Sequence, residues 1–177
     1  RNAAEGKPAG IRIKVNSMVD EQIIDALYRA SQAGVPVEVW VRGICSLKPG
    51  VPGMSENITV RSILGRYLEH SRIFSFHNDG DPTLYLGSAD LMPRNLDRRV
   101  EVLFPIEEEE MREHVVEDIL AVCLRDTAKS HILQSDGRYI PRRYQLDEDA
   151  ALFNSQEWFL SESSSRPGEY LFSRPHP

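Results

Sequence analysis

The residues best suited to chemistry form two short motifs on either side of a predicted hairpin. The first is Glu-His-Ser-Arg at positions 69–72, and the second is Gly-Ser-Ala-Asp at positions 87–90. The imidazole of His70 can act as a nucleophile or as a general acid or base near neutral pH. Gly87 lets the backbone approach an oxyanion, while Ser88 and Arg72 can donate hydrogen bonds to it. These motifs indicate a site that can hold a phosphoryl group, with two alternatives for His70: a catalytic residue of that site, or a structural histidine.

The stretch after residue 90 adds arginine and amide groups to the same candidate site. Arg94 and Asn95 can donate hydrogen bonds to phosphate, and Arg98 or Arg99 can add positive charge. Arginine is a planar, permanently charged fork that suits phosphate. Residues 42–99 hold eight basic and six acidic residues, whereas residues 105–160 hold six basic and thirteen acidic ones. Composition alone favours the simpler alternative, in which these arginines are solvated surface residues.

Length and composition bound the class of protein. The chain has 177 residues, a net charge of −6 and 41% hydrophobic residues, as expected of one ordinary globular domain. No apolar run approaches the roughly 20 residues that span a bilayer, and the polar start does not resemble a signal peptide. The acidic balance argues against nucleic acid as a partner. Because the first residue is arginine, we expect a piece of a longer protein.

The remaining histidines and the two cysteines receive structural interpretations. Cys45 and Cys123 lie far apart without a second cysteine nearby, which argues against a zinc cluster or a disulfide scaffold and suits a reducing cytosol. No two histidines have the spacing of metal ligands on one element, so no metal site is predicted within this chain. The histidines concerned are His77, His114, His131 and His176.

The elements that position the motifs begin with a strand, a helix and a strand. Residues 11–15 alternate apolar and basic side chains, and residues 35–41 are rich in β-branched residues, so both predict strands. Ser17 and Asp20 match a capping box, which predicts a helix over 17–34 with Gly34 after its end. Such a unit places the two strands side by side and parallel. The loop over 43–57 then begins where a parallel strand ends, which is where α/β folds bind ligands.

Further patterns complete a mixed sheet flanked by helices. Residues 58–64 predict a strand and 65–69 a short helix, while Asp79-Gly80 between 72–77 and 83–87 predicts a hairpin. Residues 99–104 predict a strand, 107–125 a helix, 132–139 a hairpin and 147–159 a helix. The predicted fold class is therefore α/β, with one domain over 1–160 and a flexible tail over 161–177.

The order of the motifs resembles that of two related families. The sequence His-x-Arg, hairpin, Gly-Ser-x-Asp is similar to the phospholipase D motif His-x-Lys, then Gly-Ser-x-Asn, with Arg72 and Asp90 at the departing positions. The closer resemblance is to the C-terminal region of bacterial-type polyphosphate kinases and covers residues 11–125. It is carried by VRGIC at 41–45, LKPGVPG at 47–53, SENI at 55–58, YLEHSR at 67–72 and SADLMPRNLDRR at 88–99, with a fainter similarity in NSQE at 154–157.

This resemblance implies an activity and a domain plan. The family reversibly transfers the terminal phosphate of ATP to polyphosphate through a phosphohistidine, with Mg²⁺. Its members have an N-terminal domain, a head domain and two related C-terminal domains, and the chain resembles the second of these, a phospholipase D-like half. The nucleophilic histidine and most contacts to Mg²⁺ would then lie in the other domains. Carried over by motif, Arg42 and His70 bind ATP; the weaker phosphate-binding candidates are Arg72, Ser88, Arg94, Asn95 and Arg99.

The resemblance also implies a phosphoprotein of the cytoplasm, with membrane association as an option, and a homo-oligomer in full length. The fragment by itself is expected to be inactive. Two alternatives stay open: one half of a phospholipase D-like phosphodiesterase, and a non-catalytic module that binds polyanions. Phosphodiester hydrolysis by the full-length protein would favour the first alternative. Polyanion binding that is insensitive to substitution of His70 and Arg42 would favour the second.

Overall fold

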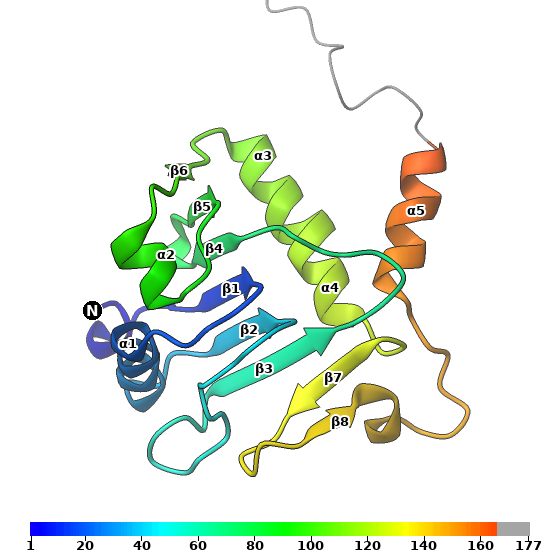
Figure 1. Cartoon of the computed structure of the whole chain (residues 1–177), viewed down its shortest axis with the longest axis horizontal. Helices are drawn as coiled ribbons and strands as arrows, with labels where there is room; N and C mark the ends of the chain where they lie inside the picture. The colour runs from blue at the N-terminus through cyan, green and yellow to red at the C-terminus, as the bar shows by residue number, and fades with distance from the viewer. Residues whose placement is uncertain (166–177) are drawn as a thin grey trace, which may run out of the picture.

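The computed structural model describes residues 1–165, which form an eight-stranded mixed sheet in the order β6-β5-β4-β1-β2-β3-β7-β8 (Figure 1). This confirms the predicted α/β class. The strands are β1 (Ile11–Val15), β2 (Val37–Val41), β3 (Ile58–Ile63), β4 (Ile73–Phe76), β5 (Thr83–Gly87), β6 (Leu103–Pro105), β7 (Ser130–Leu133) and β8 (Tyr139–Pro141).

The helices are α1 (Glu21–Gln32), α2 (Pro93–Arg98), α3 (Glu109–Glu113), α4 (Ala121–Arg125) and α5 (Ser155–Ser165). A π-helical segment, η3 (His114–Leu120), joins α3 to α4, so the predicted helix over 107–125 is confirmed with a wider turn in its middle. Short 3₁₀ turns are η1 (Ala3–Glu5), η2 (Asn78–Gly80) and η4 (Arg142–Gln145). Within the described residues, no helix is long and apolar enough to cross a membrane.

Two apolar layers hold the sheet between helices (Figure 1). On one face, Ile24 and Leu27 of α1 pack against buried valines and isoleucines of β1, β2 and β3. On the other face, Trp40 and Ile73 pack against Val115, Leu120 and other residues of the α3–α4 helix. The first layer follows from the alternation of side chains along each strand and the apolar stripe of α1.

The predicted pairing of the strands is confirmed, both for the parallel strands and for the hairpins. β1 and β2 are parallel neighbours, with Ile11 opposite Val37. β4 and β5 form the hairpin predicted from Asp79-Gly80, and Asp79 and Gly80 both have positive φ, as such a turn requires. β7 and β8 form the second hairpin. The predicted strand over 99–104 is shorter, because only Leu103–Pro105 pairs with β5.

Four predictions of local structure need correction. α1 begins at Glu21 rather than near residue 17: Asp20 accepts from the Ile23 backbone N–H at 3.0 Å, while Met18 is extended and pairs with Cys45 and Leu91. Residues 64–72 contain no helix. The arginine-rich stretch forms α2, which the sequence analysis missed. α5 begins at Ser155, not at 147, and continues to Ser165, past the predicted start of the tail; the rest of that tail lies outside the described residues.

Candidate functional site

The strand directions bring the predicted site residues to one edge of the sheet. β1, β2 and β3 run parallel, β4 runs opposite to β1, and β5 runs opposite to β4. The ends of β1, β2 and β5 therefore meet the start of β4 at the same edge. This places Asn16, Arg42 and Ser88, which follow strands, beside Arg72, which precedes one. The carboxyl ends of strands in α/β sheets are the usual place for ligands.

Asp90 is the centre of the hydrogen-bond network at this edge. Its Oδ1 accepts from the Asn16 backbone N–H at 2.8 Å and from the Asn16 side-chain amide at 3.0 Å. Arg72 reaches the same carboxylate from the other side, with Nε and Nη2 each at 3.3 Å. Burial opposes ionisation of Asp90, but the hydrogen bonds from Arg72 and Asn16 prevail and hold its pKa below the ordinary value. Asp90 thus stays charged and fixes the Arg72 guanidinium.

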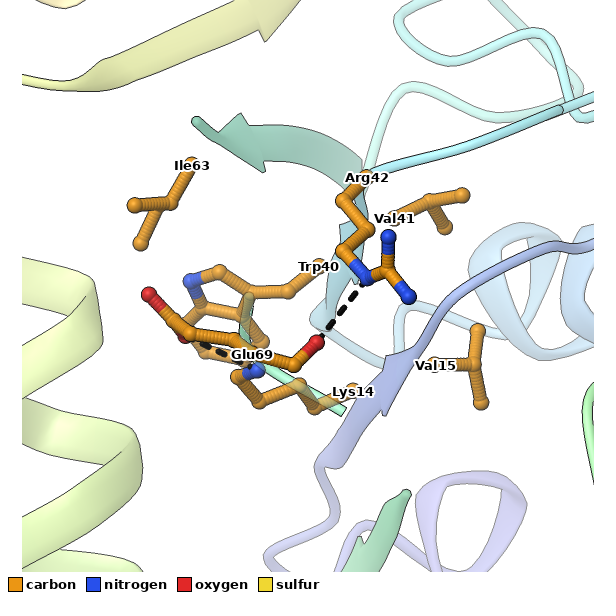
Figure 2. A pocket seen from close by; sticks show the side chains of 7 residues that line it. All are labelled: Lys14, Val15, Trp40, Val41, Arg42, Ile63 and Glu69. Atoms are coloured by element: carbon orange, nitrogen blue, oxygen red, sulfur yellow. Dashed lines mark hydrogen bonds and ion pairs between the residues drawn. The ribbon is translucent and has the colours of Figure 1, made fainter. Parts of the chain in front are cut away.

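Within the described residues, the hydrogen bonds that hold Arg42 at the end of β2 come from its Nε. This nitrogen donates to Asn16 Oδ1 at 2.6 Å and to the backbone carbonyl of Glu69 at 2.9 Å. Figure 2 shows the two terminal nitrogens of Arg42 directed away from Glu69, and both residues line a small pocket. Below them, the nearly buried Lys14 ammonium pairs with the Glu69 carboxylate at 2.9 Å. The terminal nitrogens of Arg42 are consequently oriented by the protein while remaining able to bind an anion.

His70 follows Glu69 and lies exposed at the same edge. Arg72 Nη1 lies 3.0 Å from His70 Nδ1 and donates to the His70 carbonyl at 3.0 Å. Because arginine can only donate, Nδ1 must accept, and the proton of a neutral His70 must then sit on Nε2. The chain from Asp90 through Arg72 to His70 therefore selects one tautomer and leaves Nε2 for a ligand.

Ser88 and Asn95 are joined by an acidic residue that the sequence analysis did not consider. Glu101 accepts from the Asn95 amide at 2.6 Å and from the Ser88 hydroxyl, and the two bonds lower the pKa of Glu101. Both predicted phosphate donors are thus engaged with a carboxylate. Their role in phosphate binding stays a prediction, since phosphate would have to replace Glu101. The only signal in the sequence was an acid directly after the arginine-rich stretch.

Arg94 and Arg99 are the two candidates at the ends of α2. Arg94 is exposed in the first turn of α2, and Arg99 is exposed directly after that helix. Within residues 1–165, no hydrogen bond or ion pair joins either of them to the Asp90 network. Arg99 still acts on this edge through its charge, which helps to lower the pKa of Glu101. Arg42, His70 and Arg72 are thus linked to the Asp90 network by hydrogen bonds. The α2 arginines are related to it only indirectly.

The donor set at this edge does not fit a resident Mg²⁺. Magnesium prefers several oxygen ligands in octahedral geometry. Here the Asp90 carboxylate is engaged with Arg72 and Asn16, and that of Glu101 with Ser88 and Asn95. No group of three histidine, cysteine, aspartate or glutamate side chains within the described residues could hold a metal ion. We therefore derive no catalytic step through a metal held by this chain.

Comparisons with known proteins find that the chain is similar to part of polyphosphate kinases. A family described as polyphosphate kinase C-terminal domain 2 matches residues 1–156. A polyphosphate kinase of Streptomyces coelicolor is 54% identical over 164 residues, covering 92% of this chain and 22% of the relative. One of Burkholderia ambifaria is 56% identical over 142 residues, covering 80% and 21%. The chain therefore spans about a fifth of the length of these relatives.

Solved structures agree with this result. The crystal structure of a polyphosphate kinase from Porphyromonas gingivalis superimposes with a TM-score of 0.84 at 36% identity, covering 93% of this chain and 25% of that one. Nuc from Salmonella typhimurium, a member of the phospholipase D family, superimposes with a TM-score of 0.54 at 16% identity, covering 75% of this chain and 87% of that one. At this identity the second likeness concerns the fold alone, which matches the predicted phospholipase D-like half.

Proposed function

The chain belongs to the polyphosphate kinase family, in which it corresponds to C-terminal domain 2, and on this premise we propose that it is one part of an ATP–polyphosphate phosphotransferase. The complete enzyme would move the terminal phosphate of ATP to polyphosphate and back. The phosphohistidine that carries this phosphate would form on a sister domain, and the chain described here would supply the opposite wall of the site. The observation that supports this most is the linked set of Arg42, Arg72 and His70 at one sheet edge.

Arg42 would bind phosphate oxygens of ATP. Phosphoryl transfer needs positioning and positive charge more than covalent chemistry from the protein. Arg42 meets this need because its Nε is fixed by Asn16 and Glu69, so its terminal nitrogens are oriented before a ligand arrives. A preorganised donor costs no reorganisation during the reaction. Arg94 and Arg99 would add positive charge at longer range, with Ser88 and Asn95 as secondary donors.

His70 would donate a hydrogen bond to the phosphoryl group in transfer. Its Nδ1 accepts from Arg72, so the hydrogen-bearing Nε2 is the atom that would face phosphate. Asp90 supports this state through Arg72, and Arg72 also brings positive charge close to the group. Removal of the terminal phosphate from the nucleotide leaves charge on the bridging oxygen, and a donor at Nε2 would stabilise it.

The remaining parts of the proposal concern the whole enzyme. Mg²⁺ would enter with ATP and be held mainly by the other domains, in keeping with the poor fit of this edge to a resident ion. The partners would be the N-terminal, head and first C-terminal domains, with ATP, ADP and polyphosphate as substrates and a homo-oligomer as the assembled form. We place the enzyme in the cytoplasm, with membrane association as a further proposal.

The test uses the full-length enzyme from which this chain comes. His70→Ala should lower the rate of phosphate transfer from ATP at least about 100-fold, the usual range for the loss of one hydrogen-bond donor to a developing oxyanion. Arg42→Lys should keep the charge but lose the fixed orientation, and so fall between wild type and Arg42→Ala. The matched control is His77→Ala, an exposed histidine directly after the far end of β4, which should leave the rate unchanged.

Four outcomes would contradict the proposal. A fully active His70→Ala enzyme would remove His70 from the site. Robust transfer by the 177-residue chain alone would show that no sister domain is needed. Efficient hydrolysis of phosphodiesters by the full-length protein, with no transfer from ATP, would favour the phosphodiesterase alternative. Polyphosphate binding that survives both His70→Ala and Arg42→Ala, again without transfer, would favour a binding module.

A further inference from the structure

The loop that carries His70, residues 64–71, has no regular secondary structure between β3 and β4. Its apolar side chains give it little packing: Leu64 is 59% exposed, Tyr67 46% and Leu68 72%. A segment with few buried apolar contacts opens easily unless polar contacts hold it. The position of His70 at the site is therefore decided by the hydrogen bonds that fix this loop.

Three of these hydrogen bonds come from one side chain, Gln156. Its Oε1 accepts from the Tyr67 backbone N–H at 2.9 Å, and its Nε2 donates to the Tyr67 carbonyl at 2.9 Å. Nε2 also donates to Glu69 Oε1 at 2.8 Å. Gln156 thus binds the backbone of Tyr67 as a neighbouring strand would, and it holds the carboxylate that pairs with Lys14. The backbone carbonyl of that same Glu69 fixes Arg42.

Gln156 is itself fixed firmly enough to act on the loop. It is 5% exposed in the first turn of α5, beside Ser155, which is fully buried. The Ser155 backbone N–H and hydroxyl both donate to Asp126 Oδ2, at 2.8 and 2.7 Å. Asp126 is also fully buried, and its Oδ1 accepts from the backbone N–H groups of Lys129 and Ser130. The start of α5 is therefore tied to the turn that leads into β7.

Gly65 makes room for this contact. A Cβ at position 65 would lie 2.3 Å from Gln156 Oε1 and 2.7 Å from its Cδ, far inside contact distance. The backbone of Gly65 does not have a positive φ, so an alanine could adopt the same conformation. Glycine at position 65 is thus needed because the Gln156 amide approaches closely. It is not needed for a strained backbone conformation.

We propose that Gln156 is a positioning residue for the phosphoryl-transfer site: its amide holds the 64–71 loop so that His70 and Arg42 face the same ligand. The catalytic consequence of this inference rests on the proposed function. The hydrogen bonding of the Gln156 amide to the 64–71 loop can be measured independently of it. Gln156 follows Tyr67 by 89 positions in the sequence. Part of the active-site geometry is thereby set by the first turn of the C-terminal helix.

The experiment compares Gln156→Ala, Gly65→Ala and the double variant in the full-length enzyme. Gly65→Ala should displace the Gln156 amide while sparing the fold, because the obstructing atoms are the end of a flexible side chain. Each single variant should lower kcat about 10- to 100-fold, the scale of a misplacement near 1 Å. The double variant should be no worse than Gln156→Ala alone, since both remove one contact. Gln134→Ala, which loses a 3.1 Å amide bond to the Ile132 carbonyl in the β7–β8 hairpin, should keep kcat.

Hydrogen exchange of the peptide that covers residues 64–71 gives the second measurement. It should accelerate at least about 10-fold in both single variants, because the Tyr67 amide loses its acceptor. A residue that is only structural would lower the unfolding temperature and leave kcat of the folded enzyme intact, so unchanged kcat overturns the inference. Unchanged exchange also overturns it, as does a double variant whose kcat falls by the product of the two single effects. If His70→Ala is fully active, the proposed function fails instead. Hydrogen exchange alone then tests whether Gln156 holds the 64–71 loop.

Discussion

Asp90→Asn is the most informative single substitution, because it replaces one carboxylate oxygen by an amide and changes little else. The variant keeps an oxygen for the bonds that Asp90 Oδ1 receives, including that from the Asn16 backbone N–H. It loses the Oδ2 contacts and sets a new NH₂ group against Arg72 Nη2, which lies 3.3 Å away. Two donors then face each other in a place where the Arg72 side chain is only 12% exposed.

The magnitude follows from the contacts that are lost. Removing one partner of a fully buried ion pair costs about 3–5 kcal/mol, and losing one hydrogen bond to a charged group costs about 1.5–3 kcal/mol. The Asp90–Arg72 contacts, all at 3.3 Å, are longer than those of a strong pair, and most Oδ1 bonds survive. We therefore expect Asp90→Asn to lower the free energy of unfolding by about 2 kcal/mol at pH 7.

This loss should depend on pH with a defined sign. The folded pKa of Asp90 is lowered, so its charge stabilises the fold fully above the ordinary value of 3.8 and less as pH falls through the folded pKa. The difference between wild type and Asp90→Asn should hence be constant from pH 7 to 5 and shrink below about pH 4. Urea denaturation of the 177-residue chain at pH 7, 5 and 3 measures it. A difference below about 0.5 kcal/mol at pH 7, or one that grows toward pH 3, would refute the reasoning.

Three further predictions concern stability and thiol reactivity. Asp126→Ala should lower the free energy of unfolding by about 3–5 kcal/mol in urea denaturation, because three buried donors and the part-buried Lys129 N–H lose their acceptor; a loss under 1 kcal/mol would contradict this. Gly87→Ala should cost about 1–3 kcal/mol by the same assay, because its Cβ would lie 2.9 Å from the Val102 carbonyl oxygen in the β5–β6 pairing; a stability equal to wild type would argue against so close an approach. Iodoacetamide at pH 8 should modify Cys45 first in the native chain, since burial raises the pKa of Cys123 to about 12 and that of the half-buried Cys45 less; mass spectrometry that finds Cys123 alkylated first would show the opposite order.

Several elements of the fold depend on local pattern and could be predicted from the residues alone. The alternation of Ile11–Val15 and the β-branched run before Arg42 predicted two parallel strands, and Asp79-Gly80 predicted the β4–β5 hairpin. These features depend on side-chain period and turn geometry within a few residues, which a sequence displays directly. Residue type, order and resemblance likewise predicted His70 and Arg42 as site residues.

Tertiary structure decided where chain segments end and how the site residues are held. Capping signals near Ser17 predicted a helix start that Met18 overrides, because pairing with Cys45 and Leu91 keeps it extended. Residues 65–69 read as a helix, yet they follow an irregular path fixed by Gln156 from 89 positions away. Asn16 and Glu101 belonged to no predicted motif, and no pattern indicated that Lys14 and Glu69 would form an ion pair, although these four residues orient the candidate site residues. Their roles arise from contacts across 6 to 74 positions of sequence, and local propensity carries no record of such distant partners.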